Sequence, residues 1–307
     1  MKTKWNSGVR WLQSSWRDFW VEMAPRCGYF GCNHAGSRWR RMRRRSQGVQ
    51  LQGVRYCQAE CLELALCEVL ERARPPSSRF AVGAHRIPLG LLLLSRQQLT
   101  AVQLRTALAA QRAAGHGKIG VWLQQLGFAT EPQVTAALAR QWSCPVLRSD
   151  TAVIGASYIP TIPMRLLESF QMMPVKLVKA TGTLLVAFSE GIDYTLLYAI
   201  EQMLGYRTEA CLVSPSLLRH SLETLAQQNI SSDIFFARVN DAGECARIVG
   251  NYATKVQARE VRVARCGNLF WVRLERIRLE AINLVLGVPA QPANRPPYSA
   301  ESARAPV

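Results

Sequence analysis

The sequence lacks any apolar run long enough to cross a bilayer. Its longest run, residues 89–94, contains a glycine and is far shorter than the roughly 20 residues that a membrane-spanning helix needs. The basic N-terminal region also lacks the apolar stretch of a secretory signal peptide. We therefore expect a cytoplasmic protein without a transmembrane segment.

Acidic residues are scarce relative to basic ones. The chain of 307 residues has 38 Lys and Arg against 21 Asp and Glu, a net charge of +17. Such a charge favours anionic partners, namely a nucleotide, a nucleic acid or a membrane surface. Part of it is one arginine block at residues 38–45. The block predicts either phosphate contacts with a nucleic acid or a solvated loop, which we favour because no base-reading element accompanies it.

Residues typical of catalytic sites are also few. The four histidines lie in separate contexts, so no Ser-His-Asp set can be assembled from them. The glycine-rich stretch 115–120 follows a helical run rather than a strand, and its flanking residues differ from those of a phosphate-binding loop. We therefore expect a protein that is not an enzyme.

The most informative stretch of the chain is a repeat with a period of 30 residues. A shift of this length superimposes the following pairs: Leu89 and Ile119, Gly90 and Gly120, Leu93 and Leu123, Leu104 and Val134, Gln111 and Gln141. A fixed period with apolar residues at helical spacing indicates a duplicated supersecondary unit. Each copy predicts a short helix, a turn and a second helix, with N-caps at Thr100 and Thr130.

The two copies, residues 88–111 and 118–141, resemble tandem motifs in the N-terminal domain of type II secretion and type IV pilus assembly ATPases (general secretion pathway protein E). In that bacterial family, two such motifs with a short spacer form a site for cyclic di-GMP. The resemblance continues to about residue 225 and implies secretion or pilus proteins as partners. No phosphate-loop signature follows it, so the chain resembles the regulatory domain without the ATPase domain.

The resemblance implies a cyclic di-GMP site made by Arg86, Leu89, Gly90, Leu93, Lys118, Ile119, Gly120, Leu123 and Gly127. The first motif position, an arginine in the family, is Pro88 in copy one and Lys118 in copy two, while Arg86 lies two residues early. The second glycine is Gly127 in copy two but Gln97 in copy one. Two hypotheses stay open: a regulatory adaptor that binds cyclic di-GMP, and a pure interaction scaffold with a degenerate nucleotide site.

Nine cysteines are present, and four of them form two close pairs: Cys27, Cys32, Cys57 and Cys61. Two such pairs on either side of a loop suit a tetrahedral structural zinc ion, because each pair supplies two thiolates. Residues 56–61 resemble the helix entry of a treble-clef module or zinc ribbon. His34 is an alternative ligand to Cys32, and apolar burial of the cysteines is the alternative to metal. With the arginine block, a zinc-containing nucleic-acid-binding protein is a further hypothesis.

These features predict an α+β multidomain fold, and the 49% of apolar residues is enough for two or three small cores. A tandem-repeat helical bundle is followed by a small α/β sandwich, preceded by a zinc-ribbon or treble-clef-like module and followed by a small α/β domain. The predicted boundaries are a basic N-terminal region 1–74 with the cysteine module at 27–72, a linker 75–84, a secretion-ATPase-like domain 85–228 (motifs 88–141, α/β part 145–228), a small α/β domain 231–287 and a disordered tail 288–307.

Overall fold

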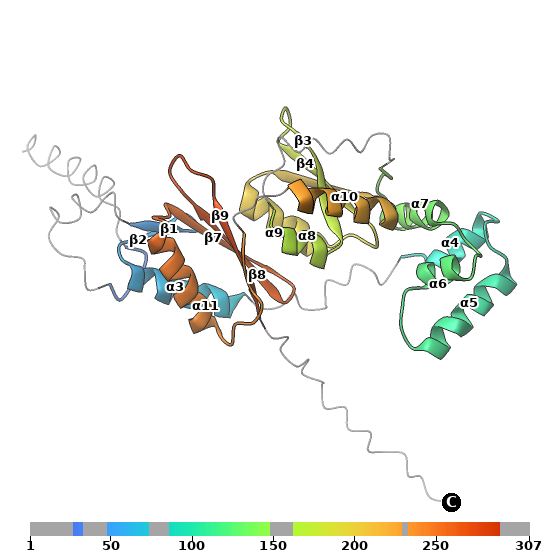
Figure 1. The fold of residues 1–307 in the computed structure, drawn as a ribbon, viewed down its shortest axis with the longest axis horizontal. Helices are drawn as coiled ribbons and strands as arrows, with labels where there is room; N and C mark the ends of the chain where they lie inside the picture. The colour runs from blue at the N-terminus through green and yellow to red at the C-terminus, as the bar shows by residue number, and fades with distance from the viewer. Residues whose placement is uncertain (1–26, 33–47, 74–85, 148–161, 229–232, 289–307) are drawn as a thin grey trace, which may run out of the picture.

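A computed structural model describes residues 27–32, 48–73, 86–147, 162–228 and 233–288 (Figure 1). His34, the arginine block 38–45, the predicted linker 75–84 and the predicted tail from residue 289 onward lie outside the described residues. The fold is α+β, as predicted, with two separate sheets among the described residues. No helix in these ranges is long and apolar enough to span a membrane.

The larger sheet is built from both ends of the chain. Its strands, in spatial order, are β2 (Val54–Tyr56), β1 (Val49–Leu51), β7 (Glu260–Cys266), β8 (Leu269–Glu275), β9 (Ile282–Gly287) and β6 (Ile234–Phe236). Strands β7, β8 and β9 form an antiparallel meander, while β1 joins β7 and β6 joins β9 in parallel. The cysteine-bearing segment and the C-terminal segment, which the sequence predicts as separate units, therefore share one sheet.

Two helices, α3 (Ala59–Arg72) and α11 (Ala242–Lys255), pack together on one face of this sheet (Figure 1). Their close approach depends on Gly250, because a Cβ at that position would lie only 2.5 Å from Cγ of Glu63 on α3. Strands as short as β1 and β2 bury too little apolar area to be stable alone. Their shared core with α11 and β7 to β9 explains why the two chain segments fold together.

The smaller sheet has the strand order β3 (Met172–Val178), β4 (Thr183–Phe188) and β5 (Arg207–Leu212). A hairpin at Gly182 joins β3 to β4, and β5 adds in parallel after α9 (Tyr194–Leu204). The sheet is accompanied by α8 (Met164–Ser169) and α10 (Pro215–Gln228). Helix α9 also packs against β7, so the two sheets are linked through this helix.

Strand β8 is buried on both faces, which explains how its side chains serve two cores. Phe270 and Val272 belong to the cluster beneath α3 and α11, whereas Trp271 belongs to the cluster that contains α9. The side chains of Trp271 and Asn283 hydrogen-bond at 3.1 Å (Nε1 to Oδ1), and Asn283 donates to Asp233 at 3.0 Å. These bonds satisfy the polar atoms that burial would otherwise leave unpaired.

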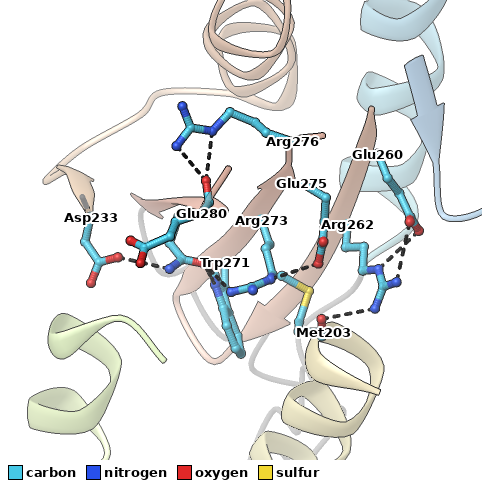
Figure 2. Close-up of polar contacts among 10 residues, drawn as sticks. Met203, Asp233, Glu260, Arg262, Trp271, Arg273, Glu275, Arg276 and Glu280 are labelled. Atoms are coloured by element: carbon cyan, nitrogen blue, oxygen red, sulfur yellow. Dashed lines mark hydrogen bonds and ion pairs between the residues drawn. The ribbon is translucent and has the colours of Figure 1, made fainter. Parts of the chain in front are cut away.

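Two arginines of the larger sheet, Arg262 on β7 and Arg273 on β8, point into contacts within the chain (Figure 2). Arg262 pairs with Glu260 and donates to the main-chain oxygen of Met203 at the end of α9, at 3.2 Å. Arg273 pairs with Glu275 at 3.0 Å. Because their guanidinium groups are already engaged, these strands do not present a free basic face.

The repeated stretch forms four helices: α4 (Leu89–Ser95), α5 (Ala101–Ala114), α6 (Ile119–Gln125) and α7 (Glu131–Trp142). We call residues 86–147 the tandem module. The predicted N-caps are confirmed, since Thr100 and Thr130 form capping boxes with Gln103 and Gln133. The module core contains repeat-related pairs, such as Leu93 with Leu123, and the structure therefore shows the duplicated helical unit that the period predicts.

Candidate functional site

The two copies of the tandem module contact each other through equivalent hydrogen bonds. Gln111 of copy one donates Nε2–H to the main-chain oxygen of Gly117 at 2.7 Å, just before copy two. Gln141 of copy two donates to the main-chain oxygen of Ile87 at 2.7 Å, just before copy one. The shift of 30 residues converts one contact into the other. A pseudo-twofold axis therefore relates the two copies.

The repeated glycines Gly90 and Gly120 are buried in helix packing. A Cβ on Gly90 would lie 2.6 Å from Cδ1 of Leu104, and one on Gly120 would lie 3.0 Å from Cγ1 of Val134, the repeat equivalent of Leu104. Both glycines thus allow close contact between helices. Of the predicted ligand residues, Leu89, Leu93 and Leu123 are also buried in the core of the module.

The predicted cations both have partners within the chain. Nζ of Lys118 lies 2.6 Å from Oε2 of Glu190, in the turn after β4. The guanidinium of Arg86 stacks on Trp142, 3.1 Å from the ring centroid. Sequence reasoning missed both partners, because each belongs to an element far along the chain. For Glu190, the signal in the sequence was a turn at residues 189–193 that contains two acidic residues.

The first copy keeps its backbone conformation where it has lost a glycine. Gln97 has φ +58°, and its repeat equivalent Gly127 has φ +70°. A side chain in this left-handed region costs roughly 1–2 kcal/mol. Copy one retains the turn despite that cost, so its helical fold is preserved although its motif departs from the family pattern.

A cavity of about 470 Å³ lies beside the end of α7 and between α9 and β5. Trp142 and Tyr194 form part of its wall, with ring centroids 6.2 Å apart, and Tyr198 and Glu209 complete one side. A Cβ on Gly191 would lie 2.9 Å from Trp142, so the glycine lets the turn after β4 approach that ring. Neither the repeat nor the cysteine pattern predicts a role for these aromatic residues.

The four paired cysteines converge at the edge of the larger sheet. The sulfurs of Cys27, Cys32, Cys57 and Cys61 all lie within 4.8 Å of one another. Four thiolates around one zinc ion would be about 3.8 Å apart, because Zn–S bonds are about 2.3 Å long. The Cys32 and Cys57 sulfurs are already 3.5 Å apart. The donor set and its spacing therefore fit a tetrahedral metal ion.

Local backbone contacts bring the two pairs together. Gly28 donates its N–H to the main-chain oxygen of Arg55 in β2 at 2.7 Å, which attaches the first pair to the strand. Cys32 donates its N–H to the oxygen of Tyr29 at 3.2 Å and closes a tight turn. Cys57 precedes α3, and Cys61 lies in its first turn. Strand, turn and helix start thus aim four sulfurs at one point.

The pKa values of the clustered cysteines are shifted in different directions. Burial, with hydrogen bonds to Cys32 and Cys27, raises the pKa of Cys57 to about 11, and burial raises the pKa of Cys61 as well. At Cys27, burial opposes ionisation, but hydrogen bonds from Tyr29 and Cys57 lower its pKa overall. Four thiolates cannot share this space without a compensating cation. A divalent metal provides that charge.

No family model matches the chain, and no curated protein matches it. Among solved structures, the chain is similar to MshE with cdg at 27% identity, covering 45% of this chain and 99% of that one, with a TM-score of 0.40. It is also similar to the N-terminal domain of XpsE at 19% identity, covering 44% of this chain and 91% of that one, with a TM-score of 0.36. A second crystal form of that domain gives 20% identity, 49% and 96% coverage and a TM-score of 0.28. Each of these three matches covers less than half of this chain and more than nine-tenths of the matched structure.

Proposed function

We propose that the protein is a non-catalytic adaptor of a type II secretion or type IV pilus machine, and that its tandem module is the docking element. The observation that carries this proposal is the set of contacts that the module makes within the chain. Its reciprocal glutamine contacts are intact, while its ligand-facing cations are already paired. The module thus keeps its duplicated helical fold, while Lys118, the cation at the motif position of copy two, already has Glu190 as its partner.

The Lys118–Glu190 pair bears directly on nucleotide binding. A phosphate that approached Lys118 would meet the carboxylate of Glu190, whose oxygen lies 2.6 Å from the ammonium. Like charges at such a distance repel, so the anion would have to displace Glu190. Copy one offers Pro88 at the equivalent position, which has no charge. Protein docking needs none of these cations.

Cyclic di-GMP binding is the second candidate, and the pseudo-twofold axis supports it. A cyclic dinucleotide with two equivalent halves matches two equivalent half-sites. Lys118 and Arg86 flank the starts of α6 and α4, where helix N-termini attract anions. In this hypothesis the phosphate replaces Glu190 as the partner of Lys118, and the protein is a regulatory adaptor that senses the messenger.

We also propose that Cys27, Cys32, Cys57 and Cys61 hold a structural zinc ion. The sulfur spacing supports the donor set, and the burial of Cys61 supports a structural rather than an exposed site. The metal would supply a cross-link between the knuckle at Cys27 and Cys32 and the start of α3. Because α3 packs on α11, this cross-link would fix the N-terminal segment on the shared sheet.

Two measurements separate these functions. Calorimetry with purified protein and cyclic di-GMP tests the second candidate: binding that is lost in Lys118→Ala supports it, whereas absence of heat at high micromolar ligand rejects it. Capture of secretion or pilus proteins by the full chain tests the adaptor role.

The repeat-equivalent surface residues Leu91 and Val121 are 52% and 43% exposed, which makes them suitable for that capture experiment. We expect Leu91→Asp with Val121→Asp to abolish capture. Leu279→Asp is the matched control, because Leu279 is 64% exposed and lies outside the tandem module. Equal capture by all variants would reject the tandem module as the docking element.

A further inference from the structure

An open groove of about 720 Å³ runs between the end of α4 and the outer side of α7. It is lined by Leu92, Arg96, Ala136, Ala139, Arg140, Ser143, Cys144 and Val146. Its lining has aliphatic and small side chains with two guanidinium groups, and it contains neither an aromatic nor an acidic residue. We call it the Arg96–Arg140 groove.

Within the described part of the chain, the two guanidinium groups have no counter-charge. Neither Arg96 nor Arg140 has an ion pair or hydrogen-bonded side chain among the described residues, and both are exposed. The tandem module contains a single acidic residue, Glu131. That carboxylate is engaged by Ser216, at 2.8 Å from its N–H and 2.7 Å from its hydroxyl. The groove therefore presents two positive charges that no described acidic side chain neutralises.

One rim of the groove is a strand edge on which no described strand pairs. Leu147 donates its N–H to Leu212 O at 2.7 Å, and Leu212 donates to Pro145 O at 2.9 Å, so residues 145–147 pair with β5 in parallel. In such pairing the N–H and C=O of the central residue, Val146, point away from β5. They have no partner among the described residues, and the Val146 side chain is 41% exposed. An edge of this kind accepts a further strand.

The repeat shows that the fold does not require these two arginines. The shift of 30 residues places Arg96 on Leu126 and Arg140 on Ala110. The equivalent positions, at the end of α6 and on α5, thus carry neither cation. Since both halves of the module fold alike, the charge of one groove is a property of that surface and not of the packing.

We propose that the Arg96–Arg140 groove binds an extended acidic peptide segment of a partner protein. The peptide main chain pairs with Val146, its carboxylates bind the two guanidinium groups, and its aliphatic side chains lie on Leu92 and Ala136, which are both half-buried. A nucleic acid fits less well, because the groove has no aromatic surface on which a base can stack. This inference rests on the proposed adaptor role and specifies the chemistry of the partner.

The test is fluorescence anisotropy on the full chain with a labelled peptide of alternating glutamate and valine. Arg96→Ala with Arg140→Ala should weaken binding about 100-fold, because each charge-assisted contact contributes roughly tenfold in affinity. The matched control is Arg105→Ala with Arg112→Ala, which removes the same charge from α5 outside the groove. A peptide of glutamine and valine should bind as weakly as the double groove variant does to the acidic peptide.

A third variant tests strand pairing without changing charge. Val146→Pro removes the N–H that faces the groove, and should weaken peptide binding while an unchanged melting temperature shows that the fold persists. Equal weakening by the groove and control variants would overturn the proposal. Equally strong competition by inorganic phosphate, or tighter binding of a DNA oligonucleotide, would do the same. The assay uses no secretion protein, so its failure is distinguishable from failure of the Leu91 and Val121 capture experiment.

Discussion

If the four cysteines hold the proposed zinc ion, its loss should loosen the attachment of the N-terminal segment to the larger sheet. The perturbation is removal of zinc by a chelator or the substitution Cys57→Ser, which deletes one of the four converging sulfurs. At free zinc 1,000-fold above its dissociation constant, binding to the native state alone contributes about 4 kcal/mol to unfolding. For a chain of this size, 1 kcal/mol shifts the melting temperature by about 2–4 °C, so we expect a decrease of about 8–16 °C.

The assay is thermal unfolding of zinc-loaded and chelated protein, together with zinc content by mass spectrometry. Cys67→Ser is the matched control, because Cys67 lies on the same helix, is half-buried and contacts Glu71 rather than the cluster. Amide exchange should increase first in β1, whose Gln50 N–H bonds to Arg259 O at 2.8 Å. Two results together would refute this reasoning: the purified protein contains no zinc, and added zinc leaves its melting temperature unchanged. Equal destabilisation by Cys67→Ser would refute it as well.

Three further changes test the packing described above. Gly90→Ala should lower the free energy of unfolding, measured by chemical denaturation, because the new Cβ would overlap buried Leu104. The overlap costs about 1–3 kcal/mol, and the higher helix propensity of alanine offsets up to about 1 kcal/mol of that cost. Unchanged stability would contradict the close packing. Glu131→Ala should cost about 1–3 kcal/mol and speed amide exchange at the start of α10, because Ser216 loses both of its bonds to Glu131; unchanged exchange there would contradict the contact. Burial raises the pKa of Cys211 to about 12, so the unfolded thiol ionises first and stability should fall as pH rises from about 9 to 12. Cys211→Ala should reduce that slope by at most about 1.4 kcal/mol per pH unit, and an unchanged slope would contradict it.

Local signals in the sequence were sufficient to predict the tandem module. Its period, its apolar spacing and the caps at Thr100 and Thr130 all act within a few residues, so the helices follow from short stretches of chain. The cysteine cluster was predictable for a related reason. Two close pairs carry their own spacing, and each needs only one turn to aim its sulfurs.

Contacts between distant segments were not predictable in the same way. The pairing of Gln50 with Glu260 joins strands at opposite ends of the chain, and the three-residue strand β1 is too short to show an alternating pattern. The ion pair of Lys118 with Glu190 depends on how the turn after β4 meets the module. Propensity and periodicity describe neighbours in sequence, so such partners appear only in three dimensions.

The split origin of the larger sheet has a consequence for synthesis of the chain. Residues 49–56 leave the ribosome early, but the strand that pairs with them begins at Glu260. The helical repeat can fold before β7 is synthesised, because its contacts are mostly local. The edge of β1 that pairs with β7 therefore stays unpaired in the nascent chain until β7 has been synthesised. If the cysteine knuckle binds the proposed zinc ion early, that ion would hold β1 and β2 beside α3 during this interval.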